Sequence, residues 1–278
     1  MKTIMHIVGT RPNYVKASPV INSIVDYKQV VLNTGQHYDD CLSKNIIDSL
    51  DMRKPDINLV DKISSLHFVT EESGINNLNS EGFSDSIHLV GNTMIDSLIK
   101  VIHSEKYRKL NINNTNNILL TCHRPSNVDN KNSLQKIFDM CYKIERKITW
   151  PLHPRTKNRM IEHNLLTRFE SLQNLDLINP LEYCKFLKYM ATSYAVITDS
   201  GGIQEETTYL KVPCLTIRKN TERPITITTG TNRLVSIKQV TNSFEKLVED
   251  TKGSRVPIMW DGYAAQRISK VISNFMEI

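Results

Sequence analysis

The stretch YAVITDSGGIQEETTYLKVPCLTI, residues 194–217, decides the fold of this 278-residue chain. An apolar run at 194–198 leads into the pair Gly201-Gly202, a helical segment begins near Ile203, and a second apolar run occupies 212–217. A short apolar strand, a tight turn, a helix and another short strand make a βαβ unit, which is typical of a parallel sheet. The sequence therefore predicts an α/β fold.

The same alternation continues in both directions along the chain. We predict further strands at 3–8, 29–32, 117–121, 148–152 and 175–178, and helices at 14–25, 40–50, 132–147 and 263–276. The length fits two domains, which we place at 1–104 and 105–278, joined through the polar stretch 104–117. The last helix packs on a core or crosses back to the first domain.

Composition and charge exclude several classes of protein. Lys and Arg number 35 against 29 Asp and Glu, a formal net charge of +6, with 40% hydrophobic and 23% charged residues. These values are ordinary for a globular protein and exclude a disordered or fibrous chain. No apolar run approaches the roughly 18 residues of a membrane span, and the N-terminus is too short for a signal peptide. We therefore expect a cytoplasmic protein with no membrane partner.

The mild positive charge suits an anionic small molecule as the ligand. Nucleic acid is not expected, because aromatic residues are 7% and no recognition motif is present. Five scattered cysteines lack the spacing of a disulfide framework or a zinc site, so we expect neither a disulfide nor a metal. We interpret Cys122, which follows the strand at 117–121, as a small residue that fills a tight strand end.

Two turns just past predicted strand ends suit anions, since parallel sheets bind ligands there. In the first, a glycine at position 9 is followed by Arg11 and Lys16 at a helix start, with solvated cations on a simple turn as the alternative. The second is D-S-G-G-I-Q-E-E at 199–206, whose glycines and serine suit a diphosphate. A carboxylate further along this helix can accept hydrogen bonds from ribose, and the alternative is an acidic first turn that complements the helix dipole.

Further cationic residues lie at other strand ends. His123 and Arg124 can bind phosphate or relay a proton, with a structural histidine as the alternative. His153 repeats this chemistry after the next strand, and Arg223 in T-E-R-P is a candidate diphosphate clamp. Together these residues predict a basic cleft.

Nine short motifs follow one another in order along nearly the whole chain. They are G-T-R-P at 9–12, T-G-Q-H at 34–37, V-G-N-T at 90–93, T-x-H-R at 121–124, H-P at 153–154, D-S-G-G-I-Q-E-E at 199–206, T-E-R-P at 221–224, G-T-N-R-L-V at 230–235 and W-D-G at 260–262. Together they resemble the bacterial, non-hydrolysing UDP-N-acetylglucosamine 2-epimerase family. The resemblance implies two Rossmann-like domains facing a cleft, the GT-B type, in a homodimer. A GT-B glycosyltransferase would share the fold but not T-G-Q-H and V-G-N-T.

The resemblance implies interconversion of UDP-GlcNAc and UDP-ManNAc for surface-polysaccharide precursors. UDP is eliminated to leave 2-acetamidoglucal and is then added back, with no metal or redox cofactor. The family pattern assigns three groups of residues: catalytic Arg11, Lys16 and His123; UDP-binding Ser200, Gly201, Gly202, Glu206 and Arg223; and, for a second, activating UDP-GlcNAc, Gln36, Arg124 and His153.

The chain departs from the family pattern after P-D-I-N-L at 55–59. Val60 is followed at once by D-K-I-S-S-L-H-F at 61–68, which matches a part of the pattern several dozen residues further on. The N-terminal domain is therefore shortened, and its sheet should have an unpaired gap. The missing part carries the family's acid/base carboxylates, one Asp and two Glu. Ser126 and Ile225 also stand where the family commonly has Glu.

No replacement acidic cluster is evident, since the acidic residues near turns lack the family context: Asp39, Asp40, Glu71 and Glu72. Three alternatives to an intact epimerase stay open. The chain is a UDP-sugar-binding remnant without catalysis, the product of an internally deleted gene, or a sequence shorter at this seam than the natural protein.

Overall fold

The computed structural model describes residues 3–8, 28–33, 57–58, 64–112, 116–251 and 253–276. Two compact units make up the chain, Met1–Phe68 with Glu81–His88, and Val69–Ser80 with Leu89–Ile278. The domain boundary expected after residue 104 stays a prediction. Within the described ranges, no helix is both long and apolar enough to cross a lipid bilayer.

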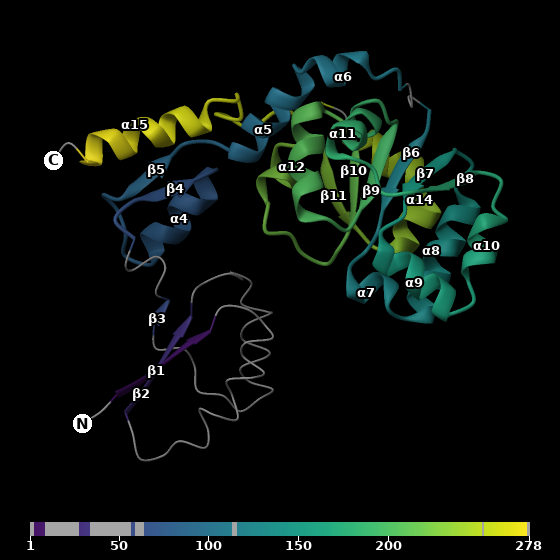
Figure 1. The fold of residues 1–278 in the computed structure, drawn as a ribbon, viewed down its shortest axis with the longest axis horizontal. Coiled ribbons are helices and arrows are strands. Elements are labelled where there is room, and N and C mark those ends of the chain that lie inside the picture. The colour runs from purple at the N-terminus through teal and green to yellow at the C-terminus, as the bar shows by residue number, and fades with distance from the viewer. Residues whose placement is uncertain are drawn as a thin grey trace. The chain divides into compact units, whose positions relative to one another are not determined.

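The first unit contains a parallel sheet of order β1-β2-β3 (Figure 1). Its strands are β1 (Thr3–Val8), β2 (Lys28–Asn33) and β3 (Ile57–Asn58). The register pairs Thr3 with Lys28 and Leu32 with Ile57. β1 and β2 confirm two predicted strands, whereas the two-residue β3 was not predicted. A separate two-stranded sheet consists of β4 (His67–Val69) and β5 (Ile87–Leu89), with α4 (Glu72–Ser80) between them in sequence.

The second unit is built on a six-stranded parallel sheet of order β11-β10-β9-β6-β7-β8. Its strands are β6 (Ile118–Thr121), β7 (Ile148–Pro151), β8 (Leu175–Ile178), β9 (Ala195–Thr198), β10 (Cys214–Ile217) and β11 (Asn232–Val235). In chain order this is the Rossmann arrangement, in which the first and fourth strands are neighbours at the centre. The structure confirms the five strands predicted here, and β11 was not predicted.

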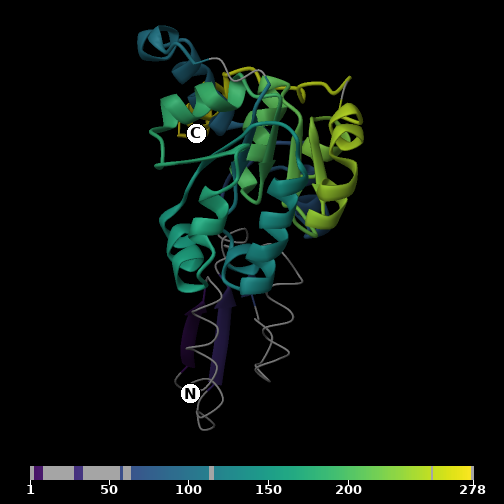
Figure 2. The same ribbon diagram turned by 90° about the vertical axis from the view of Figure 1, so that its right-hand side faces the viewer.

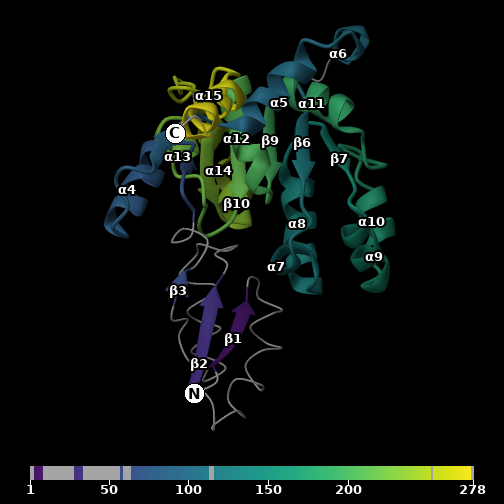
Figure 3. The same cartoon turned by 60° about the vertical axis from the view of Figure 1, so that its left-hand side comes forward.

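Helices cover both faces of this sheet (Figures 1 and 2). One face carries α8 (Lys131–Lys143), α9 (Pro154–Glu162), α10 (Leu166–Glu170) and α14 (Ile237–Glu249). The other carries α5 (Thr93–Ile102), α11 (Tyr183–Ala191) and α12 (Gly201–Leu210), as Figure 3 also shows. Besides α4, the other helices of the unit are α6 (Glu105–Lys109), α7 (Pro125–Val128), α13 (Ile225–Thr228) and α15 (Ala264–Met276).

Each central strand supplies side chains to both faces. In β6, Ile118 and Leu120 belong to the core under α8 and α14, and Leu119 belongs to the core under α11 and α12. All three are fully buried. A parallel strand covered on both faces therefore has a continuous apolar sequence. The helix predicted at 132–147 ends earlier, at Lys143, because Ile144 takes an extended backbone (φ −77°, ψ 120°) and enters the first core.

The V-G-N-T motif and the first turn of α5 contact the start of α15 and the segment before it. Asp96, in the first turn of α5, accepts the N–H groups of Ala264 and Ala265 at 3.2 and 2.7 Å. Gly91 has φ +88°, and a Cβ at this position would lie 2.1 Å from the carbonyl oxygen of Met259. Only glycine fits here, so V-G-N-T is in part a packing motif.

Candidate nucleotide-sugar site

The predicted site lies where the six-stranded sheet reverses its strand order. The chain leaves β6 toward β7 and β8, and leaves β9 toward β10 and β11, while β6 and β9 pair directly from Ile118–Ala195 to Thr121–Thr198. The crevice past the carboxyl ends of two such strands is the usual ligand site of an open α/β sheet. The cationic turn with His123 and Arg124 follows β6, and the glycine-rich turn at 199–206 follows β9.

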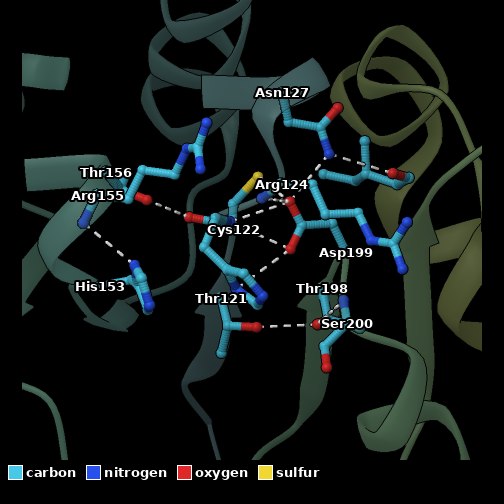
Figure 4. A network of polar contacts seen from close by, with 12 residues as sticks. Thr121, Cys122, Arg124, Asn127, His153, Arg155, Thr156, Thr198, Asp199 and Ser200 are labelled. Atoms are coloured by element: carbon cyan, nitrogen blue, oxygen red, sulfur yellow. Dashed lines mark hydrogen bonds and ion pairs between the residues drawn. The ribbon is translucent and has the colours of Figure 1, made fainter. Parts of the chain in front are cut away.

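Asp199 ties the two strand ends together (Figure 4). Its fully buried carboxylate accepts the backbone N–H groups of His123, at 3.0 and 3.2 Å, and of Arg124, at 2.8 Å. The Nδ2 of Asn127 donates to the same carboxylate at 3.0 Å, and the Cys122 thiol does so at 3.1 Å. These bonds fix the turn after β6 against the turn after β9.

Cys122 confirms the interpretation as a small residue at a strand end. It is 1% exposed, and the hydroxyl of Thr156 donates to its carbonyl oxygen at 2.7 Å. Burial first, and then the charge of Asp199, raises the pKa of the Cys122 thiol well above its ordinary value. A nucleophilic thiolate is therefore disfavoured here.

The glycine pair begins α12, as predicted. Ser200 is the N-cap with an extended backbone (φ −84°, ψ 141°), and its side chain makes no capping hydrogen bond. The Cβ of any larger residue at position 202 would lie 3.0 Å from Cε of Met94. Backbone N–H groups in the first turn of a helix attract anions. The first turn of α12, at Ser200, Gly201 and Gly202, therefore has the geometry that the predicted phosphate site requires.

Glu205 lies one turn further along α12 and is 3% exposed. The Arg223 Nε lies 3.0 Å from its Oε1, and the Asn92 Nδ2 donates to the same oxygen at 2.8 Å. No acidic residue lies in the first turn of α12, so the alternative that Glu205 and Glu206 complement the helix dipole is wrong. Glu205 instead positions Arg223, the predicted clamp.

Glu206, the predicted ribose ligand, is 5% exposed and accepts a hydrogen bond of 2.7 Å from the hydroxyl of Tyr183. Burial raises the pKa of Glu206, the Tyr183 hydroxyl opposes the rise, and the Glu205 charge adds to it. Burial and the Glu206 carboxylate raise the pKa of Tyr183 in turn. Glu206 and Tyr183 place a carboxylate and a phenol side by side, and both groups can form hydrogen bonds with sugar hydroxyls.

Hydrogen bonds to Gln204 hold the T-E-R-P turn on α12. The hydroxyl of Thr221 donates to Gln204 Oε1 at 2.6 Å and accepts the backbone N–H of Arg223 at 3.0 Å. Asn232 on β11 donates to the same Gln204 oxygen at 2.9 Å. The turn that carries Arg223 is therefore held on α12 through Gln204, which β11 also holds through Asn232.

His123, Arg124 and His153 also come together. The ring of His123 stacks on that of His153 with centroids 5.2 Å apart, and its Nδ1 lies 3.5 Å from Oδ1 of Asp199. His153 is the N-cap of α9, and its Nδ1 accepts the N–H of Arg155 at 3.1 Å. The residues predicted for the two UDP-GlcNAc molecules thus adjoin each other on this sheet.

The other predicted site residues, Arg11, Lys16 and Gln36, lie outside the described residues.

Sequence reasoning missed three contacts: those of Asn92, Tyr183 and Glu71. Glu71, for which the sequence analysis found no family context, lies near the charges of Arg223 and Glu205. Burial raises the pKa of Glu71, and the N–H of Ile225 and then the charge of Arg223 oppose this rise. Asn92 lies inside V-G-N-T, so a motif marked it, whereas no local pattern marked Tyr183. Across the described ranges, no group of three His, Cys, Asp or Glu residues is placed to hold a metal.

The parallel sheet, with its reversal of strand order between β6 and β9, defines a Rossmann-type α/β protein. The sequence profile of UDP-N-acetylglucosamine 2-epimerases matches residues 58–273. The chain belongs to this family, whose members are isomerases.

Similar proteins are known from archaea and bacteria. The UDP-N-acetylglucosamine 2-epimerase of Methanococcus maripaludis is 28% identical over 355 residues, covering 96% of this chain and 97% of the relative. That of Neisseria meningitidis is 34% identical over 207 residues, covering 69% and 55%. The crystal structure of the Methanocaldococcus jannaschii enzyme, in complex with UDP-GlcNAc and UDP, has a TM-score of 0.67 at 27% identity, covering 98% of this chain and 100% of that one.

The comparisons confirm the expected fold class, α/β of the GT-B type. The alignment with the M. maripaludis enzyme is longer than the whole 278-residue chain. That relative therefore has residues opposite gaps in this chain, as expected for a shortened N-terminal domain.

Proposed function

We propose that the chain interconverts UDP-GlcNAc and UDP-ManNAc, by eliminating UDP to give 2-acetamidoglucal and adding it back. The C2 proton of the sugar has no adjacent carbonyl and is not acidic, so departure of UDP must make the inversion possible. That route needs a firmly held diphosphate. The observation that carries the proposal is the open first turn of α12 at Ser200–Gly202, at the sheet's switch point.

The predicted site residues take the following roles in this proposal, although Arg11, Lys16 and Gln36 lie outside the described residues. The N–H groups of Gly201 and Gly202 and the hydroxyl of Ser200 bind the diphosphate, and Arg223, aligned by Glu205, clamps it. Glu206 accepts hydrogen bonds from the ribose. His123 acts beside the leaving group with Arg11 and Lys16, and Gln36, Arg124 and His153 bind the activating UDP-GlcNAc.

Proton transfer at C2 needs a positioned acid/base group. Two described carboxyl groups of the site, Glu71 and Glu206, have a raised pKa. Glu206 is assigned to ribose, which leaves Glu71 as the acid/base candidate in a chain without the family's own carboxylates. The homodimer, the cytoplasmic location and the supply of surface-polysaccharide precursors are further predictions from the family.

The direct test is the product of UDP-GlcNAc turnover, separated by anion exchange. We expect UDP-ManNAc, with traces of 2-acetamidoglucal and free UDP, at a rate at least ~10³-fold below that of a full-length relative, because positioned acid/base groups contribute about that much. Binding of UDP with no product at all would instead support the UDP-sugar-binding remnant. The intact mass of the natural protein, against 31.9 kDa, shows whether residues are present after Val60 in the cell.

The role of Glu71 is tested by Glu71→Gln, with its exposed neighbour Glu72→Gln as the matched control. We expect Glu71→Gln to lower kcat at least ~10²-fold with UDP affinity unchanged, and Glu72→Gln to do neither. Equal kcat for the two variants would remove Glu71 from the proposal.

A further inference from the structure

Arg218 is buried at the end of β10 with one edge of its guanidinium unused. Its side chain is 6% exposed, and its Nη2 donates to Oε1 of Glu222 at 2.9 Å. Its Nη1 is buried and has no hydrogen-bond partner among the residues that the structure describes. Buried polar groups without partners are rare, and a charged donor is costly to leave unpaired. This Nη1 therefore calls for an acceptor that the described part of the chain does not supply.

The unused edge of the Arg218 guanidinium points at the turn Ser200–Gly202, where the diphosphate is proposed to bind. A Cβ built on Gly201 would lie 3.9 Å from Nη1 of Arg218 and 3.7 Å from Oε2 of Glu222. Both groups thus lie over the first turn of α12, a helix of ten residues whose first N–H groups lack intrahelical acceptors. An anion seated on this turn would be within reach of Nη1.

The charge around Glu222 also favours an anion. The hydrogen bond from Arg218 lowers the pKa of Glu222, and the charges of Arg218, Arg124 and Arg223 add to the effect, against burial. Glu222 is therefore ionised at neutral pH and pairs with Arg218, while Glu205 lies 3.0 Å from Arg223. The guanidinium of Arg124 adds further positive charge near Glu222, which favours an anion such as a nucleoside diphosphate sugar.

We propose that Arg218 is a diphosphate-binding residue of the nucleotide-sugar site. Its Nη1 donates to a phosphate oxygen held on the first turn of α12, while Glu222 holds the guanidinium by the opposite edge. Because a planar fork can serve two acceptors at once, lysine is a poor substitute. This inference rests on the proposed function and adds a residue to its UDP site.

The other interpretation is that Arg218 only neutralises Glu222. A double-mutant cycle separates the two roles, because it measures the loss of Arg218 with and without the Glu222 charge. The probes are UDP, by calorimetry, and uridine, which has no phosphate, by ligand-observed NMR. Arg146→Gln is the control, since Arg146 forms a comparable ion pair with Glu245, 2.8 Å away.

We expect Arg218→Gln to weaken UDP binding at least ~10-fold and to leave uridine binding unchanged. The same loss should appear between Glu222→Gln and the Arg218→Gln/Glu222→Gln double variant. UDP affinity in Arg218→Gln within about twofold of wild type, or a loss that disappears in the Glu222→Gln background, would overturn the proposal.

If Arg218→Gln does not fold by circular dichroism, Arg218→Lys takes its place. Lysine keeps the charge beside Glu222 but not the second N–H edge, so we expect the same direction of effect on UDP. Wild-type affinity in Arg218→Lys would then contradict the inference. Wild-type protein that fails to bind UDP would refute the proposed function itself, whereas an Arg218 result alone does not.

Discussion

The carboxylate of Asp199, at the end of β9, accepts the backbone N–H of Arg124 after β6 at 2.8 Å. This bond spans the point where the sheet reverses its strand order, and it orients the turn whose residues face the proposed diphosphate. The side chain of Asp199 is fully buried and does not itself face a ligand. Its role is to position the backbone of the site.

Asp199→Ala should therefore destabilise the fold strongly. It leaves the backbone N–H groups of His123 and Arg124 without their acceptor, and each unpaired buried donor costs about 1–3 kcal/mol. The Asn127 amide loses its 3.0 Å bond to Asp199 and keeps the 3.4 Å bond to the carbonyl oxygen of Ile217. We expect the free energy of unfolding in urea to fall by about 3 kcal/mol or more. Asp129→Ala, which removes a partner of exposed Arg155 instead, should have a much smaller effect. Similar losses for the two variants would contradict this role.

Gly91→Ala and Gly82→Ala form a matched pair. Both glycines have positive φ, +88° and +93°, but an added Cβ meets the Met259 carbonyl oxygen at 2.1 Å in the first and nothing within 4 Å in the second. Gly82→Ala should cost about 1–2 kcal/mol from backbone strain alone. Gly91→Ala should cost at least ~2 kcal/mol more, because the backbone must also shift. Equal melting temperatures for the two variants would rule out the close contact.

The strands of the second unit could be predicted from the sequence for a physical reason. Strands covered on both faces, such as β6 and β9, are continuous apolar runs followed by the turns proposed to bind the nucleotide sugar. Helix α14 was missed, although Ser236 and Gln239 form a capping box that could have marked its start.

The contacts inside the site depend on the fold and have no local pattern. Asn92 and Glu205 are 113 residues apart in the chain and meet only because α5 packs on α12. Tyr183 reaches Glu206 from α11 in the same way. The motifs therefore marked the residues proposed for the site, but not the side chains that hold the described ones in position.

Glu206→Gln and Glu222→Gln should change the pH dependence of stability in opposite directions. The pKa of Glu206 is raised above its ordinary 4.5, so its contribution is present below that pH and is lost as pH rises through the folded-state pKa. The pKa of Glu222 is lowered, so its contribution is present above pH 4.5 and is lost as pH falls.

Melting temperatures between about pH 3 and pH 7 test this pair, because the Glu222 change falls below pH 4.5 and the Glu206 change above it. Relative to wild type, Glu206→Gln should gain stability as pH rises, and Glu222→Gln should lose it. The same trend in both variants would show that the direction of the pKa shift is wrong for either Glu206 or Glu222.

Arg223→Ala should weaken UDP binding at least ~10-fold, since hydrogen bonds to charged groups contribute about 1.5–3 kcal/mol. Arg223→Lys should lie between it and wild type, because an ammonium group supplies charge without the fork. Titration calorimetry measures both. Unchanged UDP affinity in Arg223→Ala would reject the clamp.

The most direct test of the account is the fate of the C2 hydrogen of UDP-GlcNAc. The whole chain is incubated with UDP-GlcNAc in D₂O, and the nucleotide sugars are examined by proton NMR over a long time course. Elimination and re-addition predict UDP-ManNAc with deuterium at C2, together with deuterium in the recovered UDP-GlcNAc. UDP-GlcNAc that binds but keeps its C2 proton and gives no UDP-ManNAc would contradict the proposed function.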